Sequence, residues 1–346
     1  MPHNGCNFTW SRNWSSNGTE LIDGYHKSSG RPRYMLKVYI MNAYDFVDWD
    51  FMWMLLQHLN FPPKFIAWTS ACVTSAWFSI SLNGSHHGFF LSSRGLRQGD
   101  SLSPYRFIII MESFDYLMKM VVADVANKFK YHPLCQHIEL THICFVDDLC
   151  IVSFADNDSI QTIKNVLIQF GEATRLKPNL NKSSCFFTGI SDESEDSLSI
   201  VIGIPKASLP VKYLGIPLIT THVSAKDCRP LIDKIRNRID GWRSKDVSFV
   251  ARIVLINSLF FGMVKYWCQS MILPDMIIKE IDEILRAFLW KGQTEGKCAH
   301  KVRWKTIVLP EKEDGLSVKS IVEWNRMSMS QHVLNICSHK EAMWIR

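Results

Sequence analysis

Two adjacent carboxylates, Asp147 and Asp148, lie between two short β-like runs, residues 142–146 and 149–154. Side chains alternate along a strand and Asp tolerates turns, so this pattern predicts a hairpin whose tip projects both carboxylates into one small volume. Like charges this close repel unless a cation lies between them. Because Mg²⁺ accepts one or two protein carboxylates and takes its other oxygens from water and phosphate, the pair is a candidate metal site. The alternative is an ordinary solvated turn.

Four further segments with distinctive sequences accompany this hairpin: residues 37–50, 94–105, 176–183 and 209–218. In order and spacing, the five motifs resemble the reverse transcriptase of plant non-LTR (LINE-type) retrotransposons, over residues 20–346. The resemblance implies a nucleotidyltransferase that is an RNA-directed DNA polymerase by ancestry. Such an enzyme uses two Mg²⁺ ions, an RNA template, a DNA primer and deoxynucleoside triphosphates.

The resemblance also implies the fold class, α+β. We expect a reverse transcriptase-like palm, built as a split βαβ antiparallel sheet with helices, and a helical thumb. The expected division is a leader at 1–19, the palm at 20–205, the primer-positioning motif E and thumb at 206–292, and a post-thumb connection at 293–346. The leader resembles a scrap of the endonuclease domain of these elements, or it is an unrelated disordered segment. The fingers would then be largely missing, and any partner that supplies them is unknown.

The chain departs from the family in the first catalytic segment. The family reads Asp-x-x-x-Ala-Tyr/Phe-Asp there, and aligning on residues 43–45 puts Tyr39 where the leading, metal-binding Asp belongs. A phenol is a poor Mg²⁺ ligand, because its ordinary pKa of about 10 keeps it neutral near pH 7. Asp45, Asp48 and Asp50 are nearby, but they fit better as the cap of the following helix. We therefore expect a degenerate site with weak metal binding and slow or absent polymerisation.

The resemblance assigns roles to four side chains around this position. Asp147 and Asp148 would bind the metal ions with the triphosphate, and Lys182 matches a lysine near the leaving pyrophosphate. Tyr44 matches the aromatic residue under the incoming sugar, where its ring would clash with a 2′-hydroxyl. Plainer alternatives are a surface lysine at Lys182 and a core aromatic at Tyr44.

A loop and a second hairpin complete the expected site. In the loop before the long helix, Gly99 would let the backbone approach the nucleic acid, and Gln98 could bond to template or nucleotide. Arg94 and Arg97 could offer positive charge to a phosphate. The second hairpin resembles the primer-positioning element of the family, and its residues are Tyr213, Leu214 and Gly215.

Hydrophobic periodicity and turn residues predict the remaining elements. Asn83-Gly84 indicates a hairpin turn. Further on, a helical stripe carries positive charge that could meet backbone phosphates or simply be solvated, and Pro274 and Gly292 bracket a later helix. The predicted strands are residues 35–41, 75–82 and 88–92, and the predicted helices are residues 46–59, 102–127 and 159–173. The apolar residues of the helical stripe are Ile232, Ile235, Ile239 and Trp242. The basic residues beside the stripe are Lys234, Arg236, Arg238 and Arg243.

The composition of the chain indicates its size class, its possible partners and its compartment. Its 346 residues, 47% of them apolar, can bury a large core, and 39 Lys and Arg against 33 Asp and Glu permit a nucleic-acid partner without demanding one. Ten cysteines without a Cys-x-x-Cys pair suit buried thiols in a reducing compartment. No signal pattern opens the chain, and the uncharged run 254–264 is too short to span a bilayer. We expect an intracellular protein, cytoplasmic or nuclear, with no membrane partner.

Two rivals to an active polymerase stay open. One is a non-enzymatic module that binds RNA or DNA through the surviving basic and aromatic surfaces. The other is a decayed retroelement remnant with no selected role. Salt-sensitive binding to an RNA–DNA duplex separates a retained nucleic-acid groove from the remnant.

Overall fold

A computed structural model of the protein describes residues 25, 30–124, 126–219, 223–241, 247–292 and 302–337. The chain forms two compact units, whose described parts lie within residues 25–208 and 209–337. The predicted leader, residues 1–19, lies outside the described residues. The division into palm, thumb and connection stays a prediction.

The first unit is built on a four-stranded antiparallel sheet of β1 (Arg33–Tyr39), β4 (His142–Phe145), β5 (Asp148–Ser153) and β6 (Ser184–Thr188). The strands lie in the order β4-β5-β1-β6. Helix α4 (Ser103–Ala123) joins β1 to β4, and α5 (Asn157–Thr174) joins β5 to β6. This is the predicted split βαβ arrangement, and the α+β fold class is confirmed.

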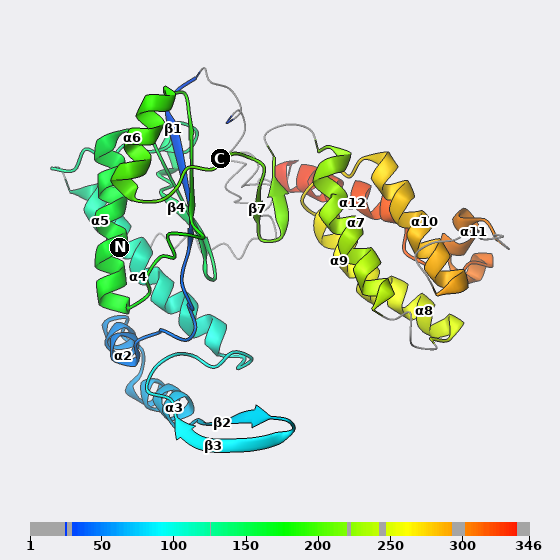
Figure 1. Ribbon diagram of the computed structural model, residues 1–346, viewed down its shortest axis with the longest axis horizontal. Coiled ribbons are helices and arrows are strands. Elements are labelled where there is room, and N and C mark those ends of the chain that lie inside the picture. Colours follow the sequence, from blue (N-terminus) through cyan, green and yellow to red (C-terminus); the bar gives the residue numbers. More distant parts are fainter. Residues whose placement is uncertain are drawn as a thin grey trace. The chain divides into compact units, whose positions relative to one another are not determined.

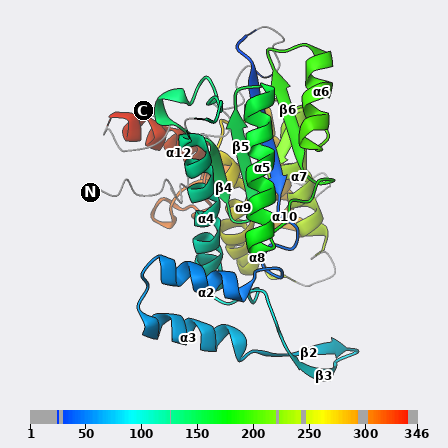
Figure 2. The ribbon, with the colours of Figure 1, turned by 90° about the vertical axis from the view of Figure 1, so that its left-hand side faces the viewer.

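Strand alternation explains why one sheet face is covered by helices. Leu36, Val38, Leu149 and Ile151 point to the face that forms the core. Helices α4, α5 and α6 (Asp192–Ile202) pack on that face in both ribbon views (Figures 1 and 2). Phe114 from α4 is fully buried there. The opposite face therefore presents the alternate side chains of β1 and β5.

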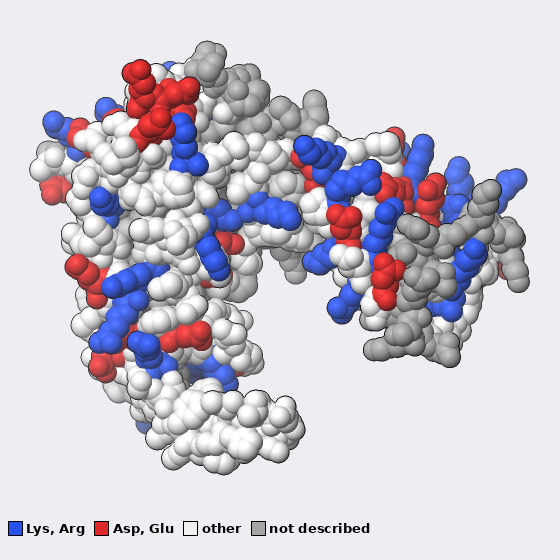
Figure 3. Space-filling view, in the orientation of Figure 1, with Lys and Arg blue, Asp and Glu red and all other residues white. Residues whose placement is uncertain are grey.

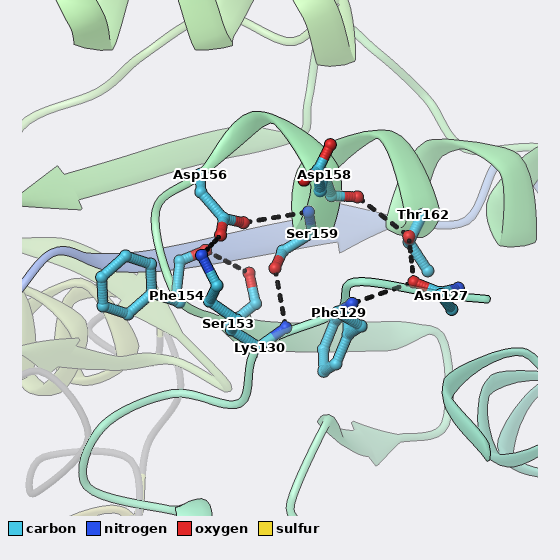
Figure 4. A network of polar contacts seen from close by, with 9 residues as sticks. All are labelled: Asn127, Phe129, Lys130, Ser153, Phe154, Asp156, Asp158, Ser159 and Thr162. Carbon is cyan, nitrogen blue, oxygen red and sulfur yellow. Dashed lines mark hydrogen bonds and ion pairs between the residues drawn. The ribbon is translucent and has the colours of Figure 1, made fainter. Parts of the chain in front are cut away.

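A polar network attaches α5 to the segment before β4 (Figure 4). Asp156 caps α5 by accepting from the Ser159 amide, and its other oxygen pairs with Lys130 Nζ at 2.7 Å. The Ser159 hydroxyl accepts from the Lys130 amide, and Thr162 donates to Asn127. The bond to Ser159 satisfies the Lys130 amide, and the Lys130 carbonyl accepts from the Phe154 amide at 3.0 Å.

Two short helices and a separate hairpin precede α4. Helix α2 is Trp49–His58, α3 is Pro63–Thr74, and the hairpin strands are β2 (Trp77–Leu82) and β3 (Ser85–Leu91). The prediction placed α2 three residues too early, because Asp48 accepts from the Phe51 amide as its N-cap. Asn83 and Gly84 both have positive φ, as the predicted hairpin turn requires.

The second unit begins with the hairpin β7 (Val211–Tyr213) and β8 (Ile216–Leu218), and its helices follow. The predicted stripe residues Ile232, Ile235 and Ile239 are buried, and so is the inner face of the predicted helix before Gly292. Trp242 and Arg243 lie outside the described residues. The helices are α7 (Ala225–Asp240), α8 (Phe249–Leu255), a π-helical turn (Ile256–Phe260), α9 (Phe261–Cys268), α10 (Asp275–Lys291), α11 (Trp304–Val308) and α12 (Ile321–Cys337).

The continuous helix from Phe249 to Cys268 corrects one prediction. It is 20 residues long and, by length and composition alone, could cross a membrane, so the prediction, which judged only the run 254–264, missed a longer apolar helix. The prediction failed because it stopped counting at Arg252 and Lys265. In the structure one face of this helix, including Phe260, Val264 and Trp267, packs in the core of the second unit. Arg252 donates to the carbonyls of residues 247 and 289, which attaches the helix to its neighbours.

A buried asparagine joins the last helix to this core. The Asn325 amide donates to the carbonyls of Cys268 and Met271 at 3.0 and 2.9 Å and accepts from the Leu273 amide at 3.0 Å. The connection between α9 and α10 has no regular backbone partners for these groups. Asn325 of α12 therefore satisfies them.

Candidate functional site

The three positions of the predicted metal site lie together at the end of β1. Tyr39 is opposite Asp148 in the antiparallel register of β1 and β5, and the Ile40 amide donates to the Asp147 carbonyl at 3.3 Å. Opposite residues on neighbouring strands have Cβ atoms about 4.5–5.5 Å apart. An acid at position 39 would therefore lie within reach of the same cation as Asp148.

The surroundings of this cluster shift the pKa values of two of its side chains, Asp148 and Tyr44. Partial burial raises the pKa of Asp148, an effect that Lys37 opposes and the charge of Asp147 reinforces. Burial, and then Asp147, raise the pKa of Tyr44, whose ring stacks on Phe107 with centroids 5.2 Å apart. Tyr44 is thus both a core aromatic and a neighbour of the carboxylates. Its role against a sugar stays a prediction.

Lys182 lies beside the substituted position. Its Nζ is 5.1 Å from the centroid of the Tyr39 ring, a cation–π contact. The loop carrying it binds the backbone of Tyr39 twice, through an Asn179 amide that donates to the Tyr39 carbonyl at 2.7 Å and a Ser183 hydroxyl that accepts from the Tyr39 amide at 3.1 Å. The structure therefore brings Lys182 and the double aspartate around Tyr39.

The donor set fits one magnesium ion better than two. Asp147 and Asp148 supply two adjacent carboxylates, which suffice for a Mg²⁺ ion that completes its shell with water and phosphate. Within the described residues no group of three or more His, Cys, Asp or Glu could hold a metal. The phenol of Tyr39 adds no charge that would hold a second ion.

The turn that carries Asp147 has an unfavourable backbone. Phe145 pairs with Asp148, so Val146 and Asp147 form a two-residue turn in which Val146 has φ +53°. Glycine normally occupies this position. The Cys144 thiol donates to the Val146 carbonyl at 3.3 Å, which supports the turn.

Val146→Gly should raise the free energy of unfolding by up to about 1 kcal/mol. The left-handed conformation costs a non-glycine residue roughly 1–2 kcal/mol, and glycine avoids this cost. Glycine also loses more conformational freedom on folding, which offsets roughly 0.5–1 kcal/mol of the gain. Urea denaturation followed by circular dichroism measures the change. Val152→Gly, in the extended part of the same hairpin, is the matched control and should lose stability. If Val146→Gly were less stable than the unmodified chain, the positive φ of Val146 would not be a source of strain.

The loop at residues 94–99 is attached to the segment after β1. Gly95 donates to the Val47 carbonyl at 2.8 Å and accepts from the Trp49 indole at 2.7 Å, while Leu96 donates to the Tyr44 carbonyl at 2.6 Å. A Cβ on Gly95, whose φ is +87°, would lie 2.8 Å from the Asp45 carbonyl oxygen. The loop therefore needs glycine there, a requirement that sequence reasoning missed.

Gly95→Ala should lower the free energy of unfolding by about 2–3 kcal/mol, because the methyl group meets backbone and the φ is strained. Gly99→Ala is the control, because Gly99 has φ +94° but open space around its Cβ position. It should cost only about 1 kcal/mol. Thermal or urea midpoints of the two variants give the comparison, and equal losses would mean that the contact with Asp45 is unimportant.

Two of the predicted loop residues, Arg94 and Gln98, line a cleft of about 650 Å³ in the first unit. Arg94 lies over the Phe46 ring at 4.5 Å, and Gln98 and Gly99 are exposed. Sequence reasoning missed the ion pair beneath this loop, Asp100 with Arg106 at 2.7 Å. An arginine on the apolar side of α4 was the available signal. The cleft is lined mainly by residues 90–98, with Phe78, Asp45, Trp49, Asp100 and Arg106.

The predicted primer-positioning residues lie in the second unit. Leu214 and Gly215 form the β7–β8 turn with φ of +50° and +82°, and Tyr213 is buried. Tyr266 of α9 donates to the Leu214 carbonyl at 2.8 Å. The turn is therefore held in place by the core helices of its own unit.

A basic groove of about 610 Å³ adjoins this hairpin, and its lining includes Lys212, Lys234, Asn237 and Arg238, with Asp233 among them. Another predicted basic residue has a structural role: Arg236, together with Arg229, bonds Glu280 of α10 at 3.1 and 3.0 Å. Lys234 is therefore the better candidate for a phosphate contact.

Comparison with known proteins agrees with this geometry. Residues 2–218 match the family model described as reverse transcriptase (RNA-dependent DNA polymerase). A putative ribonuclease H protein of Arabidopsis thaliana is 27% identical over 129 residues, covering 37% of this chain and 21% of that protein. The uncharacterized 149 kDa protein of transposon TX1 of Xenopus laevis is 24% identical, covering 84% of this chain and 22% of that protein.

Two further similarities are more distant. The Pol polyprotein of the Drosophila melanogaster retrotransposable element R2DM is 22% identical, covering 75% of this chain and 24% of its own length. A telomerase from Candida tropicalis in complex with a fragment of telomeric RNA superposes with a TM-score of 0.43 at 13% identity, covering 90% of this chain and 51% of that one. The chain spans about a fifth to a quarter of the length of the curated relatives it matches.

Proposed function

The chain belongs to the reverse transcriptase (RNA-dependent DNA polymerase) family, and from this premise we propose that it is a retrotransposon reverse transcriptase of the plant LINE type whose polymerase chemistry is impaired. The observation that carries the impairment is Tyr39 opposite Asp148, where the family motif has a third acid. The motif order and the relative from Arabidopsis thaliana support the plant lineage.

The expected partners follow from the site. Asp147 and Asp148 would hold Mg²⁺ together with a deoxynucleoside triphosphate, and bound Mg²⁺ would polarise phosphoryl oxygens and offset their charge. Lys182 offers a positive charge for the pyrophosphate, but its ammonium group lies over the Tyr39 ring. The RNA template and DNA primer would contact the loop at 94–99 and the hairpin at Tyr213-Leu214-Gly215. An intracellular location, cytoplasmic or nuclear, follows from this activity.

Templated incorporation of a deoxynucleotide on an RNA–DNA primer-template tests the proposal. We expect slow incorporation in Mg²⁺ and faster incorporation in Mn²⁺, because Mn²⁺ compensates for imperfect ligation. Asp147→Asn should abolish both. Rapid processive synthesis by the unmodified chain in Mg²⁺ would overturn the impairment.

The second candidate is a non-enzymatic module that binds primer-template. The loss of the third acid, with a basic groove of Lys212, Lys234 and Arg238 in the second unit, favours it. Absent incorporation in both metals, with duplex binding intact, would select this function. Absence of binding as well would point to a decayed remnant.

Lys234→Ala should flatten the slope of log affinity against log salt by about 0.9 for an RNA–DNA duplex, because it removes one phosphate contact. Arg229→Ala is the matched control, since its guanidinium is already bound to Glu280. Filter binding from 50 to 200 mM salt measures the slopes. An equal effect of the two substitutions would exclude the groove as the surface that binds the duplex.

A further inference from the structure

One long stretch of the first unit has no acidic side chain. Residues 51–99 contain no Asp or Glu, and their Lys and Arg are Lys64, Arg94 and Arg97. The stretch covers nearly all of α2, with α3, β2, β3 and the loop at 94–99. In Figure 3 the β2–β3 hairpin is a white surface with positive charge at its base. A polyanion that binds this stretch would therefore not be repelled by any negatively charged side chain within it.

The β2–β3 hairpin exposes large aromatic side chains. Trp77 and Phe89 are 62% and 74% exposed, and Ile80, Leu82 and Leu91 are also at the surface. The two strands pair only with each other among the described strands. Exposed apolar surface of this size commonly marks an interaction site.

Arginines and aromatic rings alternate where the hairpin joins the rest of the unit. Phe78 and Phe90 stack with centroids 6.1 Å apart, and both line the cleft of about 650 Å³. Arg97 lies over the Phe78 ring at 5.8 Å and Arg94 over the Phe46 ring at 4.5 Å. Among the described residues, no carboxylate forms an ion pair with either guanidinium.

Two acidic residues line this cleft, Asp100 and Asp45. Asp100 is paired with Arg106, and its pKa is lowered by a hydrogen bond from the Leu102 amide, by Arg106 and by the charge of Arg97. Asp45 also lines the cleft, and its backbone lies against Gly95. Two arginines, Arg94 and Arg97, and the amide Gln98 line the same cleft and can meet a ligand there. The volume of the cleft is within the range of about 300–1,000 Å³ typical of small-molecule and cofactor sites.

We propose that the hairpin and the cleft at its base form a binding platform for single-stranded nucleic acid. Unpaired bases stack on Trp77 and Phe89, while Arg94 and Arg97 contact the phosphates. Such platforms combine exposed aromatic rings with cations and tolerate any base sequence. A duplex fits less well, because its bases already stack on each other. An apolar protein partner would leave the two arginines without an acceptor.

This inference rests on the proposed function only for the identity of the strand, an unpaired template. Binding itself requires neither the double aspartate nor a metal. Asp147→Asn should therefore abolish incorporation and leave single-strand binding unchanged. The two proposals can fail separately.

The test is fluorescence anisotropy of the full chain with a labelled 15-nucleotide oligo-uridine, without metal or triphosphate. Trp77→Ala and Phe89→Ala should each weaken binding about tenfold with an unchanged salt slope. Arg94→Ala and Arg97→Ala should each flatten the salt slope by about 0.7. Tyr116→Ala is the matched control, because Tyr116 is 60% exposed on α4 outside the acid-free stretch, and it should bind like the unmodified chain.

Two results would overturn the proposal. In the first, both aromatic variants, shown by circular dichroism to be folded, bind the oligonucleotide with unmodified affinity. In the second, analytical ultracentrifugation finds a dimer of the unmodified chain that Phe89→Ala dissociates, while oligonucleotide binding is unaffected. The hairpin would then be a protein interface.

Discussion

Replacing Tyr39 with Asp should raise templated nucleotide incorporation in Mg²⁺ by about 100-fold or more. Loss even of a residue that only orients a metal ligand costs roughly 10–100-fold in affinity or activity, and position 39 would be a direct ligand. The register of β1 and β5 places the new carboxylate next to Asp148. The substitution also removes the ring under Lys182, which frees that ammonium group for a phosphate.

Two controls separate charge from bulk. Tyr39→Asn removes the ring without adding charge, and Tyr39→Phe keeps the ring without the hydroxyl. Both should remain near the activity of the unmodified chain, and Tyr39→Asp with Asp147→Asn should be inactive. If Tyr39→Asn gains as much as Tyr39→Asp, steric relief and not metal binding limits the site.

A thermal shift gives a second readout that does not depend on activity. Three clustered carboxylates repel one another without metal. Tyr39→Asp should therefore melt below the unmodified chain in EDTA and recover with millimolar Mg²⁺, since binding to the folded state raises stability. The unmodified chain should respond less. Equal Mg²⁺ responses would show that position 39 contributes no ligand.

Asp100→Ala should lower the free energy of unfolding by about 3 kcal/mol, because it leaves the charge of Arg106 buried without a partner. Arg106 is only 6% exposed, and its Nη1 bonds Asp100 Oδ2 at 2.7 Å. The buried Nη2 of Arg106 has no hydrogen-bond partner, so Asp100 already satisfies only part of this guanidinium group. Asp100 also accepts from the Leu102 amide at the start of α4. Urea denaturation at pH 7 measures the loss.

Arg106→Leu is the informative companion variant. A leucine of comparable apolar volume removes the buried charge, so stability should stay within about 1 kcal/mol of the unmodified chain or rise. The double variant, Asp100→Ala with Arg106→Leu, should recover most of the loss. If the double variant is as unstable as Asp100→Ala alone, the aspartate acts through the Leu102 amide and not through the ion pair.

The fold could be predicted well wherever the signal was local. Three local signals each reflect what the backbone of one short segment requires. They are the alternating runs around Asp147-Asp148, the Asn83-Gly84 turn, and Gly292 at the end of α10. The split βαβ sheet came from the family resemblance and agrees with the structure. The early start predicted for α2 failed because Asp48, and not Asp45, is the cap.

The sequence predicted which residues belong to the candidate site, but it did not predict which of them contact one another. The position of Lys182 over Tyr39, the pairing of Arg236 with Glu280, and the approach of Gly95 to Asp45 all join residues distant in the sequence. No periodicity or spacing encodes such pairs, because they depend on how separate elements pack. The predicted roles of Tyr44, Gln98 and Gly99 need a bound nucleic acid to test them.

The buried amide of Asn325 limits where the chain can be shortened. A fragment ending near residue 292, at the predicted end of the thumb, would lose the groups that bond the backbone of Cys268, Met271 and Leu273. Those peptide groups would need water inside an apolar core, which costs about 1–3 kcal/mol for each unsatisfied group. Expression of the second half should therefore keep α12, since a cut at the motif boundary would yield an insoluble product.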